Sequence, residues 1–191
     1  MNKFGRLFSL SIFGESHGES VGVTLDGVPA GIPLSEKSFA ADLARRKSGK
    51  RGTTPRKESD APHIMSGVFK GRTTGAPLTI LFYNENTLSG DYANLVAHPR
   101  PSHADWVATQ KYKGYADYRG GGHFSGRLTL ALVAAGVVAK KILKRRHRTL
   151  EIESRLLEIG GCTEPDRFPE VIEAALRSQD SIGGQIGRAH V

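Results

Sequence analysis

A short stretch near the amino end, GESHG at residues 14–18, places a hydroxyl beside an imidazole between glycines. The spacing satisfies G-x-S-x-G, the nucleophile elbow of serine hydrolases, in which a strand turns sharply into a helix. Residues 19–27 instead alternate between apolar and polar side chains, which predicts a second strand. This context argues against Ser16 as a nucleophile. It favours His17 as the reactive residue, because an imidazole can gain or lose a proton near neutral pH. The alternative without chemistry is a plain glycine-bounded hairpin turn.

A basic segment, residues 45–57, offers a second kind of chemistry. Seven of its 13 residues are basic: Arg45, Arg46, Lys47, Lys50, Arg51, Arg56 and Lys57. Proteins that bind single-stranded nucleic acid usually add aromatic residues for stacking, and this segment has none. Because guanidinium groups grip phosphate and carboxylate in bidentate fashion, a small polyanion is the sharper interpretation. The alternative is a solvated basic loop.

The stretch HPRPSHADW, residues 98–106, carries two further proton carriers, His98 and His103. Arg100 lies between two prolines, which hold the backbone extended and lower its entropy. Two histidines could belong to a metal site, but no cysteine cluster and no H-E-x-x-H pattern supports one. We therefore expect no metal.

The last candidate is DYRGGGHFSGR, residues 117–127, which runs into a predicted helix. Three glycines would let backbone N–H groups approach a ligand, and a helix N-terminus adds partial positive charge. Arg119, Ser125 and Arg127 add hydrogen-bond donors, so phosphate or the edge of a flavin would suit this place. The alternative is a flexible loop in which Ser125 caps the helix.

The elements that must position these residues follow from hydrophobic periodicity. Strands and helices occur in separate groups, which favours an α+β fold over a doubly wound sheet. Residues 84–124 are polar and weakly periodic, and a loop of that length is usually functional or disordered. The predicted strands span 8–12, 21–26, 65–69, 76–83 and 150–160, and the predicted helices span 35–46, 126–147 and 168–179.

Composition bounds the class of protein. The 191 residues suffice for one domain or part of a larger one. A formal charge of +8, from 27 Lys and Arg against 19 Asp and Glu, favours an anionic partner. Cys162 is the single cysteine, so no internal disulfide forms and a reducing compartment fits. The sequence has neither a signal-peptide core nor an apolar run of about 18 residues, so we expect a cytoplasmic protein.

Taken together, these motifs resemble the chorismate synthase family. FGESHG, DGVPAGIPL, TPRKE, MSGVFKGRTTGAP, RPSHAD and DYRGGGHFSGR stand in the family's order and near its spacing, from about Leu7 to Gly184. The resemblance implies a lyase of the shikimate pathway of aromatic amino acid biosynthesis. Its reaction is the 1,4-anti-elimination of phosphate from 5-enolpyruvylshikimate 3-phosphate to give chorismate. Reduced FMN is required although there is no net redox change.

The resemblance also implies roles for individual residues. His17 matches the histidine that protonates the leaving phosphate, and His103 matches the histidine at flavin N1. The flavin-contacting segment corresponds to His123, Phe124 and Ser125, and the anion-binding arginines correspond to Arg46, Arg51, Arg100 and Arg127. In members that reduce their own flavin, NADPH lies at Arg46 and Arg51. Ser102 and Leu128 depart from the common glycine and glutamate, and Arg56 is a weaker match.

The implied fold is a β-α-β sandwich, with long helices enclosed between antiparallel sheets, in a homotetramer. It implies a phosphorylated small-molecule substrate and neither nucleic-acid nor membrane partners. Members of the family are nearly twice as long, so we expect residues 1–184 to be the N-terminal part of a single domain that forms no chorismate alone. Residues 185–191, QIGRAHV, match what a common sequencing adapter encodes, and we expect a non-native tail. A serine hydrolase using Ser16 and a basic nucleic-acid-binding module are the alternatives.

Overall fold

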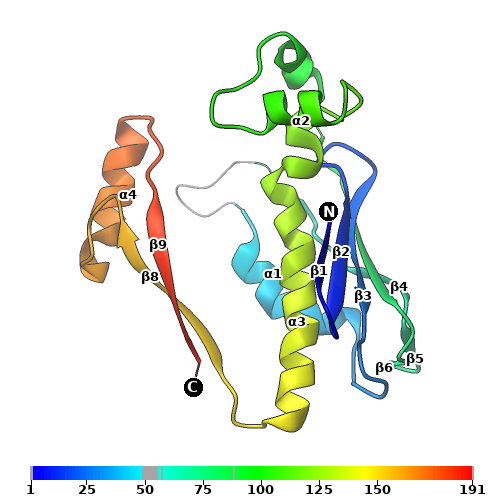
Figure 1. Cartoon of the computed structure of the whole chain (residues 1–191). Helices are drawn as coiled ribbons and strands as arrows, with labels where there is room; N and C mark the ends of the chain where they lie inside the picture. Colours follow the sequence, from blue (N-terminus) through cyan, green and yellow to red (C-terminus); the bar gives the residue numbers. More distant parts are fainter. Residues whose placement is uncertain (1, 49–55, 57, 88, 191) are drawn as a thin grey trace. The chain divides into compact units, whose positions relative to one another are not determined.

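The structure, a computed structural model, describes residues 2–48, 56, 58–87 and 89–190. The chain divides into two compact units, one of residues 1–47 and 56–142 and the other of residues 48–55 and 143–191. Both units contain antiparallel strands accompanied by separate helices (Figure 1), so the predicted α+β class is confirmed. Within the described ranges no helix is both long and apolar enough to cross a bilayer.

The first unit is built on a five-stranded antiparallel sheet with the strand order β1-β2-β3-β7-β4. Alternating side chains of β3 and β7 are buried, which is the period-two pattern that predicted both strands. Between the predicted strands 65–69 and 76–83 lies a further short strand, β6, which pairs with β5. The strands are β1 (Lys3–Gly5), β2 (Ser9–Gly14), β3 (Ser20–Asp26), β4 (His63–Ser66), β5 (Val68–Phe69), β6 (Arg72–Thr73) and β7 (Leu78–Tyr83).

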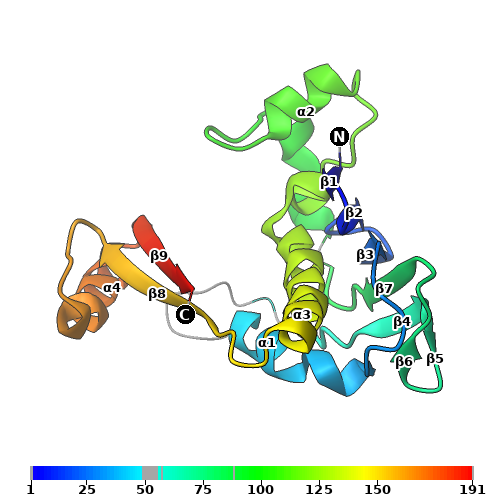
Figure 2. The ribbon, with the colours of Figure 1, turned by 60° about the horizontal axis from the view of Figure 1, so that its bottom comes forward.

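Helices α1 (Ala40–Arg46) and α3 (Thr129–Arg146) share one apolar core with this sheet, and Figure 2 shows both beside its strands. Short 3-10 turns lead into them, η1 (Glu36–Phe39) and η4 (Gly126–Leu128). The long helix α3 carries apolar side chains over most of its length up to Leu143. In the first unit it buries one face, whereas Leu132 on another face is 45% exposed.

The segment predicted as a long loop contains helical structure. It holds η2 (Ser89–Val96), α2 (Asp105–Lys111) and η3 (Arg119–Phe124). Helix α2 has seven residues, and Trp106 and Val107 within it are each 61% exposed. Its apolar residues therefore form no buried stripe, which is the signal that periodicity detects.

The second unit contains a two-stranded antiparallel sheet of β8 (Ile152–Ile159) and β9 (Gly184–His190). Between these strands lie η5 (Pro165–Arg167) and α4 (Phe168–Arg177), so the predicted strand and helix of this region are confirmed. Strand β9 includes six of the seven residues predicted to be a non-native tail. Their origin is a question about the coding DNA, and that expectation stays a prediction.

Candidate functional site

Ser16 and His17 lie in the turn that joins β2 to β3, so the predicted strand-turn-strand context is confirmed. Both are buried, with exposed fractions of 1% and 7%. The Ser16 hydroxyl accepts a hydrogen bond from Arg56 Nη1 at 3.0 Å. Among the described residues no imidazole accepts a hydrogen bond from Ser16, so nothing in this part of the chain activates it as a nucleophile.

The imidazole of His17 is enclosed by the segment of three glycines. A Cβ atom built at Gly120 would lie 2.2 Å from both Cε1 and Nδ1 of His17, which only glycine avoids. Tyr92 lies edge-on to the same ring, with centroids 4.9 Å apart. His17 Nδ1 is buried and has no hydrogen-bond partner in the described part of the chain. A buried polar atom of this kind indicates a place for a further partner.

The glycine segment is anchored to the end of β2 by two hydrogen bonds. Ser16 N donates to Gly122 O at 3.0 Å, and His123 Nδ1 lies 3.0 Å from Gly14 O. Because a carbonyl oxygen only accepts, the proton of this bond belongs to Nδ1 of His123. Gly120, Gly121 and Gly122 have φ values of 59°, 80° and 53°, which permit the backbone to approach the turn so closely.

Three guanidinium groups gather beside this turn, from segments far apart in the sequence. Arg127 Nη1 lies 2.6 Å from Asp60 Oδ1, and Arg46 Nη1 lies 3.7 Å from Asp60 Oδ2. Arg56, besides its bonds to the hydroxyl and carbonyl oxygens of Ser16, pairs with Glu58 at 2.6 Å. Three cations and two carboxylates thus surround the buried turn, an arrangement that favours an anionic ligand.

Burial and neighbouring charges set the protonation of these groups. Burial, followed by Arg56 and Arg119, lowers the pKa of His17. Burial also lowers the pKa of Arg46, aided by Arg127 and Arg56 and opposed by Asp60. Because each shift disfavours positive charge, an anion bound here would raise the pKa of both groups. The site therefore couples anion binding to protonation of His17.

A further ion pair, Arg100 with Asp105, lies close to the glycine segment. Arg100 binds Asp105 through two hydrogen bonds of 2.8 and 3.0 Å, which raise the pKa of Arg100 and lower that of Asp105. Arg100 Nη2 lies 3.6 Å from a Cβ position built at Gly121, so it reaches the glycine segment. His103 is exposed, and its backbone N–H donates to the carbonyl oxygen of Arg100 at 3.3 Å. No contact between the described residues joins His103 to His17.

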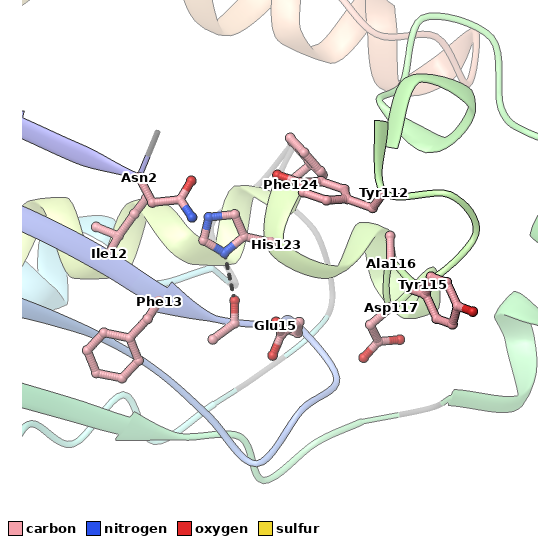
Figure 3. A pocket seen from close by; sticks show the side chains of 11 residues that line it. Asn2, Ile12, Phe13, Glu15, Tyr112, Tyr115, Ala116, Asp117, His123 and Phe124 are labelled. Atoms are coloured by element: carbon pink, nitrogen blue, oxygen red, sulfur yellow. Dashed lines mark hydrogen bonds between the residues drawn. The ribbon is translucent and has the colours of Figure 1, made fainter. Parts of the chain in front are cut away.

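A cavity of about 400 Å³ lies against the end of β2 (Figure 3). His123 and Phe124, both predicted flavin contacts, line it. Ser125 accepts a hydrogen bond from Arg127 N at 3.3 Å and caps η4, as the alternative interpretation of that residue held. Apolar and aromatic side chains make up most of the wall, including Ile12, Phe13, Tyr112, Tyr115, His123 and Phe124.

The structure adds acidic and amide residues that motif reasoning missed. Glu58 and Asp60 follow the basic run directly, and that reversal of charge was the available signal. Asn84 gives no sequence signal, yet its amide donates to Glu15 O and Gly18 O and its oxygen accepts from Arg127. Arg51, a predicted anion-binding residue, lies outside the described residues. Across the described ranges, no group of three or more His, Cys, Asp or Glu residues is placed to hold a metal ion.

Comparisons with known proteins identify the family of this chain. The family model described as chorismate synthase matches residues 8–189. A chorismate synthase of Chitinophaga pinensis is 59% identical over 184 residues, covering 96% of this chain and 54% of the relative. One of Thermococcus kodakarensis is 44% identical over 200 residues, covering 94% of this chain and 56% of the relative. The chain thus spans about half the length of these relatives.

A solved structure supports the fold. The crystal structure of a chorismate synthase matches with a TM-score of 0.55 and 28% identity, covering 85% of this chain and 41% of the other. This likeness and the antiparallel sheets with helices confirm the predicted type of fold. The matched residues include every motif on which the resemblance rested, and the chain belongs to the chorismate synthase family.

Proposed function

We propose that residues 1–184 form the N-terminal part of a cytoplasmic chorismate synthase. In this proposal the chain binds 5-enolpyruvylshikimate 3-phosphate and assists the loss of its phosphate to give chorismate. One observation carries the proposal: Arg56 contacts Ser16 next to the buried His17, whose Nδ1 lacks a partner among the described residues, and Arg46 and Arg127 meet at Asp60. A substrate with one phosphate and two carboxylates matches this concentration of positive charge.

His17 is the proposed donor of a proton to the departing phosphate. As the C–O bond breaks, its electron pair leaves with the phosphate oxygen, which gains negative charge that a proton can neutralise. Burial and two arginines lower the pKa of His17 in the absence of ligand. A phosphate dianion nearby reverses that effect. The imidazole would thus become protonated when substrate is bound, at the moment when a proton is needed.

The proposed cofactor is reduced FMN, which when bound supplies electron density for C–O cleavage and regains it afterwards. The cavity beside β2 fits an aromatic ring system, since ligand pockets measure roughly 300–1,000 Å³ and are mostly apolar. Its Phe124 and Tyr112 rings lie 6.1 Å apart. We assign the flavin contacts to His123 and Phe124 and the position near flavin N1 to the exposed His103. NADPH at Arg46 and Arg51, as the reductant of the flavin, is part of the same proposal.

The burial of the arginines favours a small ligand over nucleic acid. Arg127 is 7% exposed, and Arg56 and Arg127 are paired with Glu58 and Asp60. A protein that binds a nucleic-acid strand without sequence preference instead lines an open groove with cations. The proposed assembly is the homotetramer of the family, with neither nucleic-acid nor membrane partners.

A segment exchange tests the proposal. Residues 1–184 of this chain replace the matching segment of the Chitinophaga pinensis relative, and chorismate formation is measured with reduced FMN. We expect turnover, and we expect His17→Gln to lower it by about 10²- to 10⁴-fold, the usual contribution of a proton donor. The control is His147→Gln, which removes an exposed imidazole. A folded but inactive chimera, or a His17→Gln chimera as active as its parent, would contradict the proposal.

The 191-residue chain itself should form no chorismate under the same conditions. Weak flavin binding is the most that we expect of it. Turnover by the purified chain with added reduced FMN would show that this expectation is wrong.

A further inference from the structure

Asp60 is a buried carboxylate that no proposed chemical step uses. Its exposed fraction is 5%, and it lies where two cations of the site meet. Arg127 Nη1 is 2.6 Å from Oδ1, and Arg46 Nη1 is 3.7 Å from Oδ2. A buried charge is tolerated only when it is paired. The structure therefore ties this carboxylate to two of the predicted anion-binding residues at once.

The backbone at Asp60 is turned to make this contact. Its φ of 51° lies in the left-handed region, which is unfavourable for residues with a Cβ atom. The three side chains come from separate elements: Arg46 ends α1, Asp60 precedes β4, and Arg127 lies in η4. Strained backbone persists where the surrounding structure requires it, and it concentrates at functional sites.

Asp60 belongs to a set of three acceptors that fixes the plane of the Arg127 guanidinium. Arg127 Nε donates to Asn84 Oδ1 at 2.7 Å, Nη1 donates to Asp60, and Nη2 donates to Tyr83 O at 3.3 Å. Each Nη carries a second N–H. The group is thus held in one orientation and retains donors for a ligand.

Arg46 is held by longer hydrogen bonds than Arg127, and Asp60 is the carboxylate with which its guanidinium pairs. Its Nη2 lies 3.1 Å from Gly126 O, 3.4 Å from Thr129 Oγ1 and 3.5 Å from Arg127 O, while its Nε is buried with no hydrogen-bond partner among the described residues. Arg127 and Arg56 lower the pKa of Arg46, after the larger effect of burial, and Asp60 raises it. Without the carboxylate, the guanidiniums of Arg46 and Arg127 would repel each other.

We propose that Asp60 is a positioning residue that holds Arg46 and Arg127 as a fixed pair, ready to meet a phosphorylated ligand. Preorganised donors bind charge without reorganising first, which is what an anion site requires. The identity of the ligand rests on the proposed function, whereas the effect of Asp60 on the two arginines does not.

The direction in which a substitution changes ligand affinity distinguishes a positioning role from a simple effect of charge. Asp60→Asn keeps the shape of the side chain and removes one negative charge from the site. Coulomb attraction alone would then make a phosphorylated ligand bind more tightly. Loss of positioning makes it bind more weakly, because the arginines must be ordered at the time of binding.

The first measurement is NMR of the arginine Nη–Hη groups, which make the contacts with Asp60, in the 191-residue chain. We expect resolved signals for Arg46 and Arg127 in the parent and their loss in Asp60→Asn. Signals of Arg100, which pairs with Asp105, should stay unchanged and serve as an internal control. Asp42→Asn, which removes the partner of Lys140 at 2.7 Å, should also leave the Arg46 and Arg127 signals in place. Unchanged Arg46 and Arg127 signals in Asp60→Asn would overturn the proposal.

The second measurement is kinetics of the chimera described above. We expect Asp60→Asn to raise KM for the substrate and to lower kcat/KM by about 10- to 100-fold, the effect of a small misplacement. A lower or unchanged KM would overturn the proposal. Should Asp60→Asn not fold, Asp60→Glu retains the charge but shifts the carboxylate, and KM should rise likewise or the proposal is wrong. An inactive parent chimera would refute the proposed function alone, since the NMR measurement still decides the role of Asp60.

Discussion

Replacing Gly120 by alanine pushes a methyl group into the ring of His17. The built Cβ lies 2.2 Å from His17 Cε1 and Nδ1 and 3.1 Å from Ser16 Oγ. Carbon atoms in contact prefer about 3.5–4.0 Å, so the ring or the glycine segment must move by more than about 1 Å. Gly120 also has a φ of 59°, which disfavours alanine.

The magnitude follows from these two effects. Left-handed backbone costs a residue with a Cβ atom roughly 1–2 kcal/mol, and overpacking adds typically about 1–3 kcal/mol. We expect Gly120→Ala to lower the free energy of unfolding by about 2–5 kcal/mol. Because the displaced ring becomes more exposed, the pKa of His17 should rise toward its ordinary value.

Gly121→Ala is the matched control. Its φ of 80° carries a similar backbone cost, but the nearest atom to its built Cβ is Arg100 Nη2 at 3.6 Å, an ordinary contact. We expect a loss of about 1–2 kcal/mol and an unchanged His17. Denaturant unfolding measures the stabilities, and NMR titration follows the imidazole. Equal stabilities and equal His17 titration in the two variants would refute the idea that Gly120 encloses this ring.

Three further predictions concern other parts of the first unit. Because folding lowers the pKa of His17, the unfolded chain binds more protons than the folded chain at mildly acidic pH. The free energy of unfolding should therefore fall as the pH drops below about 6.5. In His17→Gln, the contribution of His17 to this pH dependence should disappear from denaturant unfolding. Phe124→Ala should weaken FMN binding to the chimera, measured by flavin fluorescence, whereas Trp106→Ala, an exposed aromatic outside the cavity lining, should not. Leu130→Ala in the core of α3 should cost about 2–5 kcal/mol, and the half-exposed Leu132→Ala clearly less, in denaturant unfolding. FMN binding unaffected by Phe124→Ala, or equal costs for the two leucines, would contradict these expectations.

Periodicity predicted the elements whose side chains alternate between core and surface. Strands β3 and β7 bury every second side chain, and α3 buries one face over several turns, so local sequence carried enough signal. Helix α2 was missed because it is short and buries only Ala108. The position of such a helix depends on tertiary contacts, which a local sequence pattern does not report.

The sequence predicted the basic residues of the site but not the carboxylates, Glu58 and Asp60, that pair with them. Arg46 ends a helix, as predicted, and Arg56, for which the basic run offered either a polyanion site or a solvated loop, reaches Ser16. Asp60 and Arg127 are 67 positions apart, so their pairing depends on the folded sheet between them. Motifs identified the cations that we propose as ligand contacts, whereas their counter-charges required three-dimensional proximity.

The two hydrogen bonds that anchor the glycine segment to the end of β2 have a kinetic consequence. The bond between His123 and Gly14 spans 109 positions, so we expect the enclosure of His17 to close after the sheet has brought distant parts of the chain together. The segment can also lift away while β2 and β3 stay paired, as local openings in proteins do. Deuterium exchange at the Ser16 amide would count those openings, and each one gives solvent brief access to the buried imidazole.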